Sequence, residues 1–78
     1  TPAHKPYYLD TLGVALLKQG KAHDAIPALK ESTETIPKDQ PGFLVEAYGH
    51  LADAYRAAGD ETAAREAAAK RDLLLEKK

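Results

Sequence analysis

The sequence contains no cysteine, methionine or tryptophan, has a single phenylalanine, and carries no long apolar run. The absence of cysteine excludes disulfides, thiolate metal ligands and cysteine nucleophiles, and it is compatible with oxidising and reducing compartments alike, so localisation stays open. The apolar run nearest the end of the chain is only Leu73-Leu74-Leu75, whereas a membrane-spanning helix needs about 18 apolar residues or more. We therefore expect no membrane partner.

Neither sign of charge is in excess. The 11 basic and 12 acidic residues leave a net charge of −1, so the chain as a whole has no field that attracts nucleic acid. Basic residues do gather in the last segment, but acidic residues are interleaved with them, a pattern typical of a mixed, solvated helix face. We expect no nucleic-acid partner. The basic residues are Arg65, Lys70, Arg71, Lys77 and Lys78, and the acidic ones are Glu61, Glu66, Asp72 and Glu76.

The length and composition indicate one small helical domain. The chain has 78 residues, fewer than the roughly 100–200 of a typical domain. Alanine supplies much of the 44% apolar share, which favours closely packed helices in an ordinary soluble protein. The chain begins at Thr1 without an initiator methionine or a signal-like segment, so we expect it to be part of a longer protein.

A first helix is predicted over about residues 7–19. Pro6 suits a first helical turn, which leaves residues 1–5 as an N-terminal tail, and Gly20 provides a left-handed terminator. Gly13 lies inside this helix, where glycine costs about 1 kcal/mol of helix stability relative to alanine. Its presence there indicates that another helix backbone approaches closely. The face with i, i+3, i+4, i+7 spacing consists of Leu9, Leu12, Gly13 and Leu16.

A second helix is predicted from the residue after Lys21 to about Thr35. The short connection favours an antiparallel hairpin with the first helix. Pro27 removes a hydrogen bond from a helix interior, which can cost about 3 kcal/mol, so either Asp24 caps a helix that starts late or the helix bends. The residues expected to face the first helix are Ala22, Ala25, Ile26, Leu29 and Ser32.

The second half of the chain predicts another helical hairpin. Pro41 suits the first turn of a third helix, expected over residues 42–58, closed by Gly59 and among the longest. Asp60 is a natural N-cap for a fourth helix that begins at Glu61. The apolar residues at helical spacing are Leu44, Ala47, Tyr48, Leu51, Ala52 and Tyr55 in the third helix, and Ala63, Ala64, Ala67, Ala68, Leu74 and Leu75 in the fourth.

The two halves of the chain match each other at a constant offset of 39 residues. Self-similarity at a period of a few tens of residues is typical of a solenoid, in which each unit buries its apolar face against its neighbours. We therefore predict an all-α fold of two antiparallel helical hairpins. The matched pairs are Leu12 and Leu51, Ala15 and Ala54, Leu16 and Tyr55, Gly20 and Gly59, and Ala25 and Ala64.

The first half resembles the tetratricopeptide repeat (TPR), through Leu9-x2-Leu12-Gly13-x2-Leu16 followed by Gly20, Ala25-x3-Leu29 and Pro37. The second half is similar at Tyr48, Leu51, Ala52, Tyr55, Gly59 and Ala64, but Ala68 stands where a large residue is usual and Arg71 where a small one is usual. The resemblance implies an α-α superhelix.

The resemblance covers residues 6–78, as a single domain of two repeats at 6–39 and about 42–78. The TPR period is about 34 residues, so the offset of 39 leaves an insertion near 37–44. We expect this extra length to affect the superhelix geometry.

Members of the TPR family act as protein-interaction scaffolds, and the resemblance implies a concave groove lined by the first helix of each hairpin. A mixture of apolar and charged residues there suits a peptide or helix with apolar anchors. Alternatively, Val14 and Leu17 pack on a helix of a further repeat or of a second copy. The expected groove residues are Tyr7, Asp10, Val14, Leu17 and Lys18 from the first helix, and Glu46, Gly49, His50, Asp53 and Arg56 from the third.

No group of residues in the sequence is typical of a catalytic or metal site. His4, His23 and His50 lack the i, i+4 spacing that places two ligands on one helical face. The five glycines never cluster into a phosphate-binding loop. Glu31 and Glu34 share a helical face, but such pairs are usually solvated. We predict a non-enzymatic protein without a metal or other cofactor.

Two functional hypotheses follow. The first is a protein-protein interaction scaffold that binds a peptide or helix of a partner protein in the groove. The second is a structural or capping module of a longer helical-repeat protein, or a self-association module, because repeat folds usually need about three units and this chain has two.

Overall fold

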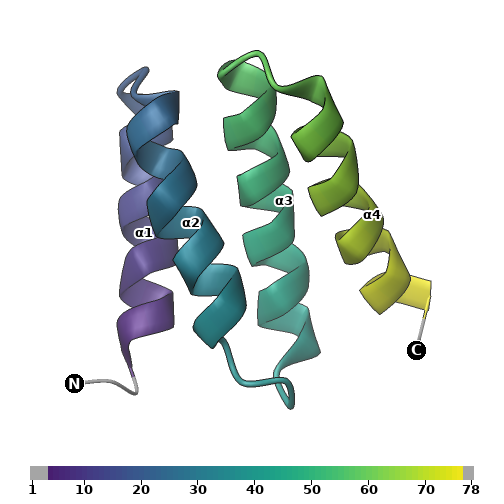
Figure 1. The fold of residues 1–78 in the computed structure, drawn as a ribbon. Coiled ribbons are helices and arrows are strands. Elements are labelled where there is room, and N and C mark those ends of the chain that lie inside the picture. The colour runs from purple at the N-terminus through teal and green to yellow at the C-terminus, as the bar shows by residue number, and fades with distance from the viewer. Residues whose placement is uncertain (1–3, 77–78) are drawn as a thin grey trace.

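The structure, a computed structural model, describes residues 4–76, and these residues form four helices. The helices are α1 (Lys5–Lys18), α2 (Ala22–Thr35), α3 (Pro41–Ala57) and α4 (Glu61–Glu76). Successive helices run antiparallel (Figure 1). The pairs α1–α2 and α3–α4 form two hairpins, which are joined mainly by the packing of α2 on α3. The predicted all-α fold of two antiparallel hairpins is confirmed.

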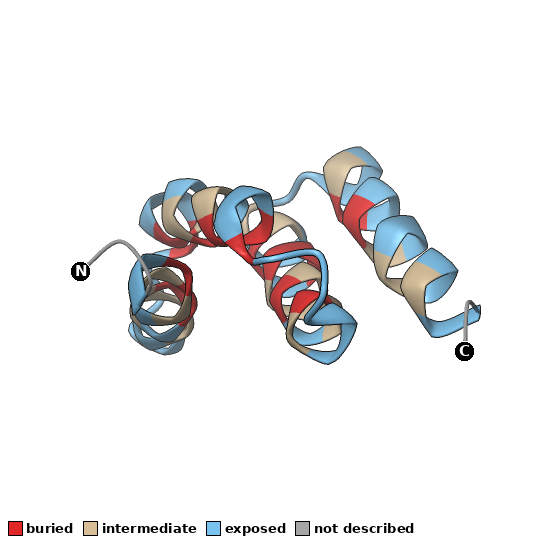
Figure 2. Cartoon of the chain, turned by 90° about the horizontal axis from the view of Figure 1, so that it is seen from below, coloured by how far each residue is buried: buried red, intermediate tan, exposed pale blue. Residues whose placement is uncertain are grey.

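The hairpins form a flat slab with Cα extents of 32 × 30 × 15 Å. Viewed along the helices, α1 and α3 lie on one side of the slab and α2 on the other, while α4 begins on the side of α2 and slants across toward the level of α3 (Figure 2). Buried residues are concentrated where α1, α2 and α3 meet and are sparse on α4. The first helices of the two hairpins therefore share one face.

The helix ends have identifiable chemical causes, although α1 begins at Lys5, inside the tail predicted for residues 1–5. Gly20 and Gly59 have φ values of 78° and 88°, the left-handed conformation in which glycine ends a helix at no steric penalty. Pro41 is at the start of α3, which with 17 residues is the longest helix of the described residues. The Ala63 amide donates to Asp60 Oδ1 at 3.1 Å, so Asp60 is the N-cap of α4.

Pro27 lies inside α2, which begins at Ala22 and continues to Thr35. The alternative in which Asp24 caps a late-starting helix is therefore wrong, and Asp24 belongs to the first turn. Pro27 lacks the N–H that would pair with the His23 carbonyl. Both residues are exposed, so water can hydrate that carbonyl.

The core is small and rich in alanine. Its central cluster consists of Ala25, Leu29, Leu51, Ala52, Ala54 and Ala67. A smaller cluster of Ile36, Leu44 and Ala47 lies where α2 ends and α3 begins, and Leu74 packs against it. The prediction that Leu75 continues the apolar stripe of the fourth helix is wrong, because Leu75 is 45% exposed. Leu74 faces the cluster, and the next residue on an α-helix points about 100° away.

The first helix of the second hairpin is longer than the first helix of the first hairpin. Lys5 and Pro41, which begin α1 and α3, are 36 residues apart, whereas Gly20 and Gly59 are 39 apart. The difference arises within α3, which is three residues longer than α1 (17 and 14 residues).

Candidate functional site

The side-by-side arrangement of α1 and α3 creates the α1–α3 face, which we define as the exposed surface of these two helices on their shared side of the slab (Figure 2). The two helices contact each other directly. Because the predicted groove residues all come from α1 and α3, the fold carries them on adjacent elements.

The structure brings two of the predicted residues together, Asp10 of α1 and His50 of α3. The Nδ1 and Oδ1 atoms are 2.9 Å apart, and the side chains are 35% exposed for His50 and 11% for Asp10. The imidazole Nδ1–H donates to the carboxylate, which is mostly removed from water and therefore needs such a partner. This hydrogen bond joins the first hairpin to the second across 40 residues of sequence.

Tyr7 closes one end of the α1–α3 face. Its ring meets the Phe43 ring edge-on, with centroids 4.5 Å apart and an interplanar angle of 83°. Its hydroxyl donates a hydrogen bond to the Gln40 side-chain oxygen. Tyr7 therefore contacts residues at the start of the second hairpin, whereas Asp10 contacts His50 in the middle of α3.

The remaining predicted residues of α1 differ in exposure. Leu17 is partly buried and packs against the central core cluster. Val14 is partly buried as well, whereas Lys18 is exposed. On α1, Lys18 is therefore the predicted residue most accessible to a partner.

The remaining predicted residues of α3 lie on two sides of the helix. Glu46, Asp53 and Arg56 are exposed. Arg56 lies between two carboxylates, at 3.8 Å from Asp53 and 3.5 Å from Glu61, in ion pairs that are solvated and therefore weak. Gly49 lies toward α4, because a Cβ added to it would be 3.7 Å from Arg71 Cδ.

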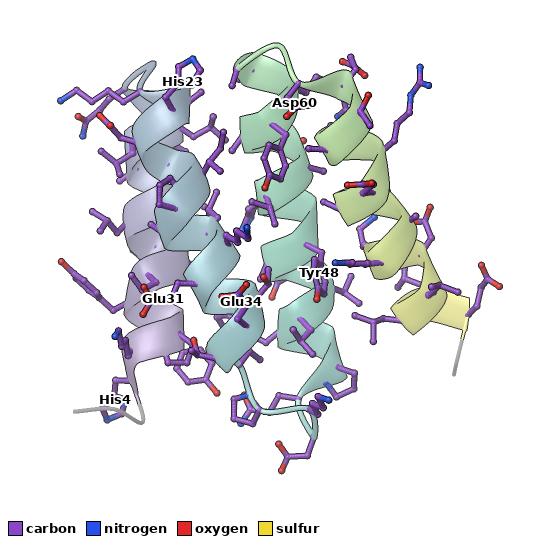
Figure 3. The ribbon with its side chains drawn as sticks, viewed as in Figure 1. His4, His23, Glu31, Glu34, Tyr48 and Asp60 are labelled. Atoms are coloured by element: carbon purple, nitrogen blue, oxygen red, sulfur yellow. The ribbon has the colours of Figure 1, made fainter. Side chains whose placement is uncertain are left out.

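Two hollows in the surface were not predicted, and no predicted groove residue lines either of them. The larger, of about 670 Å³, lies between α3 and the second half of α4. The smaller, of about 240 Å³, lies between α2 and α4 over α3. Tyr48 contributes to both and is on the side of α3 toward α4 (Figure 3). The larger hollow is lined by Lys38, Pro41, Gly42, Leu44, Tyr48, Lys70, Leu73 and Leu74.

The sequence does contain a signal for these hollows. Tyr48 and Tyr55 are large residues two helical turns apart on α3, while the facing residues of α4 include the alanines Ala63 and Ala67. Alanine side chains are too short to cover tyrosine rings. A run of small residues opposite large ones therefore indicates uncovered aromatic surface.

Residues 4–76 contain no group of three histidine or acidic side chains that could hold a metal ion. His4 and His23 lie at opposite ends of the first hairpin (Figure 3), so the histidines are not brought together. Within the same residues, no helix is both long and apolar enough to cross a membrane.

Comparison of the chain with protein-family models, curated proteins and solved structures gives no match.

Proposed function

We propose that the chain is a TPR-like, non-enzymatic protein-interaction module whose α1–α3 face binds an extended or helical segment of a partner protein. The observation that carries this proposal is the Asp10–His50 hydrogen bond, because it fixes α1 and α3 relative to each other. The same two helices carry exposed side chains of both charge signs, Lys18 on α1 and Glu46 and Arg56 on α3. A surface preorganised on two packed helices loses little entropy on binding.

A catalytic role for the same pair has less support. A histidine that acts as a general base must be within hydrogen-bond reach of the group that it deprotonates. Among the described residues, the one side-chain hydrogen bond of His50 is to Asp10, and no hydroxyl donates to it. The pair therefore fits a role in positioning α1 and α3.

Selection from a random peptide library displayed on phage tests the proposal. Peptides recovered on the immobilised wild-type chain are measured against Lys18→Glu and Arg56→Glu, with Glu34→Arg on α2 as the matched control. We expect each change on the α1–α3 face to weaken binding about fivefold or more, with no effect of the control. A selection in which every recovered peptide binds all three variants as it binds the wild type would contradict the proposal.

A second candidate function, a structural module of a longer stack or of a self-assembly, is favoured by the bare outer surface of α1. At the 39-residue offset, Tyr8, Leu12 and Ala15 of α1 correspond to Ala47, Leu51 and Ala54 of α3. The α3 residues are 0%, 5% and 0% exposed. In contrast, Tyr8 is 65% exposed, Ala15 is exposed and Leu12 is partly buried. The corresponding surface is thus covered in the second hairpin and uncovered in the first.

Light scattering over a concentration series tests this second candidate. If α1 stacks on a second copy, the mean mass rises with concentration, and Tyr8→Glu abolishes the rise. The matched change is Thr11→Glu, on the same helix at another exposed residue. A mass equal to one chain at every concentration would exclude self-association.

A further inference from the structure

The larger hollow, which we call the α3–α4 groove, has an apolar floor. Its floor residues are Leu44, Tyr48, Leu73 and Leu74. Leu44 belongs to the small cluster where α2 ends and α3 begins, and Tyr48 and Leu74 pack against that cluster, so the floor is anchored in the core. Leu73, in contrast, is 57% exposed. The volume of about 670 Å³ lies within the roughly 300–1,000 Å³ typical of ligand-binding clefts.

Lys38 and Lys70 are the charged residues that line this groove. Neither forms an ion pair within residues 4–76. The Lys70 ammonium lies over the Tyr48 ring, 5.9 Å from its centroid, a cation–π contact that holds it beside the floor. The groove therefore combines apolar surface with positive charge and contributes no carboxylate of its own.

The two lysines belong to opposite ends of the floor. Lys38 is in the connection just before Pro41, and Lys70 lies over Tyr48. Pro41 and Tyr48 are seven residues apart on α3, which corresponds to about 10 Å at 1.5 Å per residue. The positive charge is thus distributed along the groove.

We propose that the α3–α4 groove binds an extended peptide segment in which two carboxylate side chains flank two apolar ones. At the 3.1 Å rise of a polyproline II segment, residues i and i+3 are about 9 Å apart, close to the about 10 Å of α3 between Pro41, which Lys38 precedes, and Tyr48, over which Lys70 lies. The two intervening side chains point to different sides of such a segment, so one of them contacts the apolar floor formed by Leu44, Leu73 and Leu74. An amphiphile with a single carboxylate, such as a fatty acid, would neutralise one lysine and leave the other unpaired.

This binding site is separate from the α1–α3 face, because none of the residues of the proposed interaction face lines the groove. The two sites can therefore be tested independently. A variant on one face serves as the control for the other.

Fluorescence anisotropy with a labelled peptide, Gly-Ser-Glu-Leu-Leu-Glu-Ser-Gly, tests the proposal. The comparison peptides replace both glutamates by glutamine, or both leucines by serine. The protein variants are Lys38→Glu, Lys70→Glu and Leu73→Ser, all at exposed residues, and the matched control is Lys18→Glu on the α1–α3 face. Circular dichroism confirms that each variant keeps its helicity.

We expect saturable binding to the wild-type chain, weakened about fivefold or more by each lysine reversal in the groove and by removal of the peptide charges. We expect Leu73→Ser and the serine peptide to weaken it too, and Lys18→Glu to leave it unchanged. Absence of saturable binding to the wild type would overturn the proposal, as would equal binding of the glutamine peptide. If sodium dodecanoate displaced the probe at lower concentrations than the unlabelled peptide does, the peptide proposal would be overturned in favour of a monocarboxylate ligand.

Discussion

Leu29 of α2 packs directly on Gly13 of α1. Leu29 is fully buried, and a Cβ added to Gly13 would overlap the Cγ and Cδ2 atoms of the leucine. The corresponding residues of the second hairpin, 39 positions later, are Ala52 and Ala68. At this position the first hairpin therefore pairs glycine with leucine. At the corresponding position the second hairpin has two alanines.

We expect Gly13→Ala to destabilise the chain. Alanine gains about 1 kcal/mol of helix propensity, but overpacking a buried leucine typically costs about 1–3 kcal/mol, and Leu29 is fully buried. The matched control is Gly42→Ala, because a Cβ at Gly42 meets nothing within 4 Å. Urea unfolding checks both variants, and a Gly13→Ala variant as stable as Gly42→Ala would disprove the close approach.

We expect His50→Ala to lower the free energy of unfolding by about 1–3 kcal/mol, because it leaves the Asp10 carboxylate mostly buried without its partner. A double-mutant cycle with Asp10→Ala isolates the pair, and a coupling of about 1 kcal/mol or more is expected. The same cycle on the exposed pair Asp53 and Arg56, 3.8 Å apart, should give about 0.5 kcal/mol or less. Equal couplings in the two cycles would show that Asp10–His50 contributes no more than a surface pair.

Leu17 should be sensitive to charge although it belongs to the predicted groove. It packs against the core cluster, so Leu17→Glu places a carboxylate against apolar side chains, and we expect a loss of about 2–3 kcal/mol. Leu73→Glu, at a residue that is 57% exposed, should change stability by about 0.5 kcal/mol or less. Thermal unfolding of both variants distinguishes core packing of Leu17 from a purely binding role, which would leave the unfolding temperature unchanged.

The start of α4 should depend on its cap. Removal of the Asp60 carboxylate deletes the hydrogen bond from the Ala63 amide, and the expected loss for Asp60→Ala is about 1 kcal/mol. The matched control is Asp39→Ala, in the exposed connection between the hairpins, which should leave the free energy of unfolding nearly unchanged. If the two alanine variants unfold at the same urea concentration, the cap does not stabilise α4.

The helices could be predicted from the sequence because local signals set their ends. Gly20 and Gly59 end α1 and α3 through backbone conformation, and Asp60 begins α4 through a bond three residues away. Prolines at the starts of α1 and α3 agree with these limits. The sequence does not decide whether Pro27 ends a helix, because that depends on whether the unpaired His23 carbonyl reaches water.

The contacts of the candidate site could not be predicted in the same way. Asp10 and His50 are separated by 40 residues, and the sequence places them in the groove only through the resemblance to the TPR, which does not indicate that they pair. Only the packing of one hairpin on the other brings the two together. Similarly, the α3–α4 groove depends on how far α4 diverges from α3 (Figure 1), a tertiary property that the repeat pattern does not specify.

The absence of cysteine from the chain makes one measurement especially direct. A benzophenone label is attached to Asp53→Cys on the α1–α3 face or to Glu34→Cys on α2, and photo-crosslinked partners are quantified by mass spectrometry. If partners bind at the α1–α3 face, we expect about fivefold more crosslinked partner from residue 53 than from residue 34. The unlabelled wild-type chain should reduce crosslinking from residue 53, whereas the unlabelled Arg56→Glu variant should not. Equal crosslinking from the two positions, or equal competition by Arg56→Glu, would contradict it.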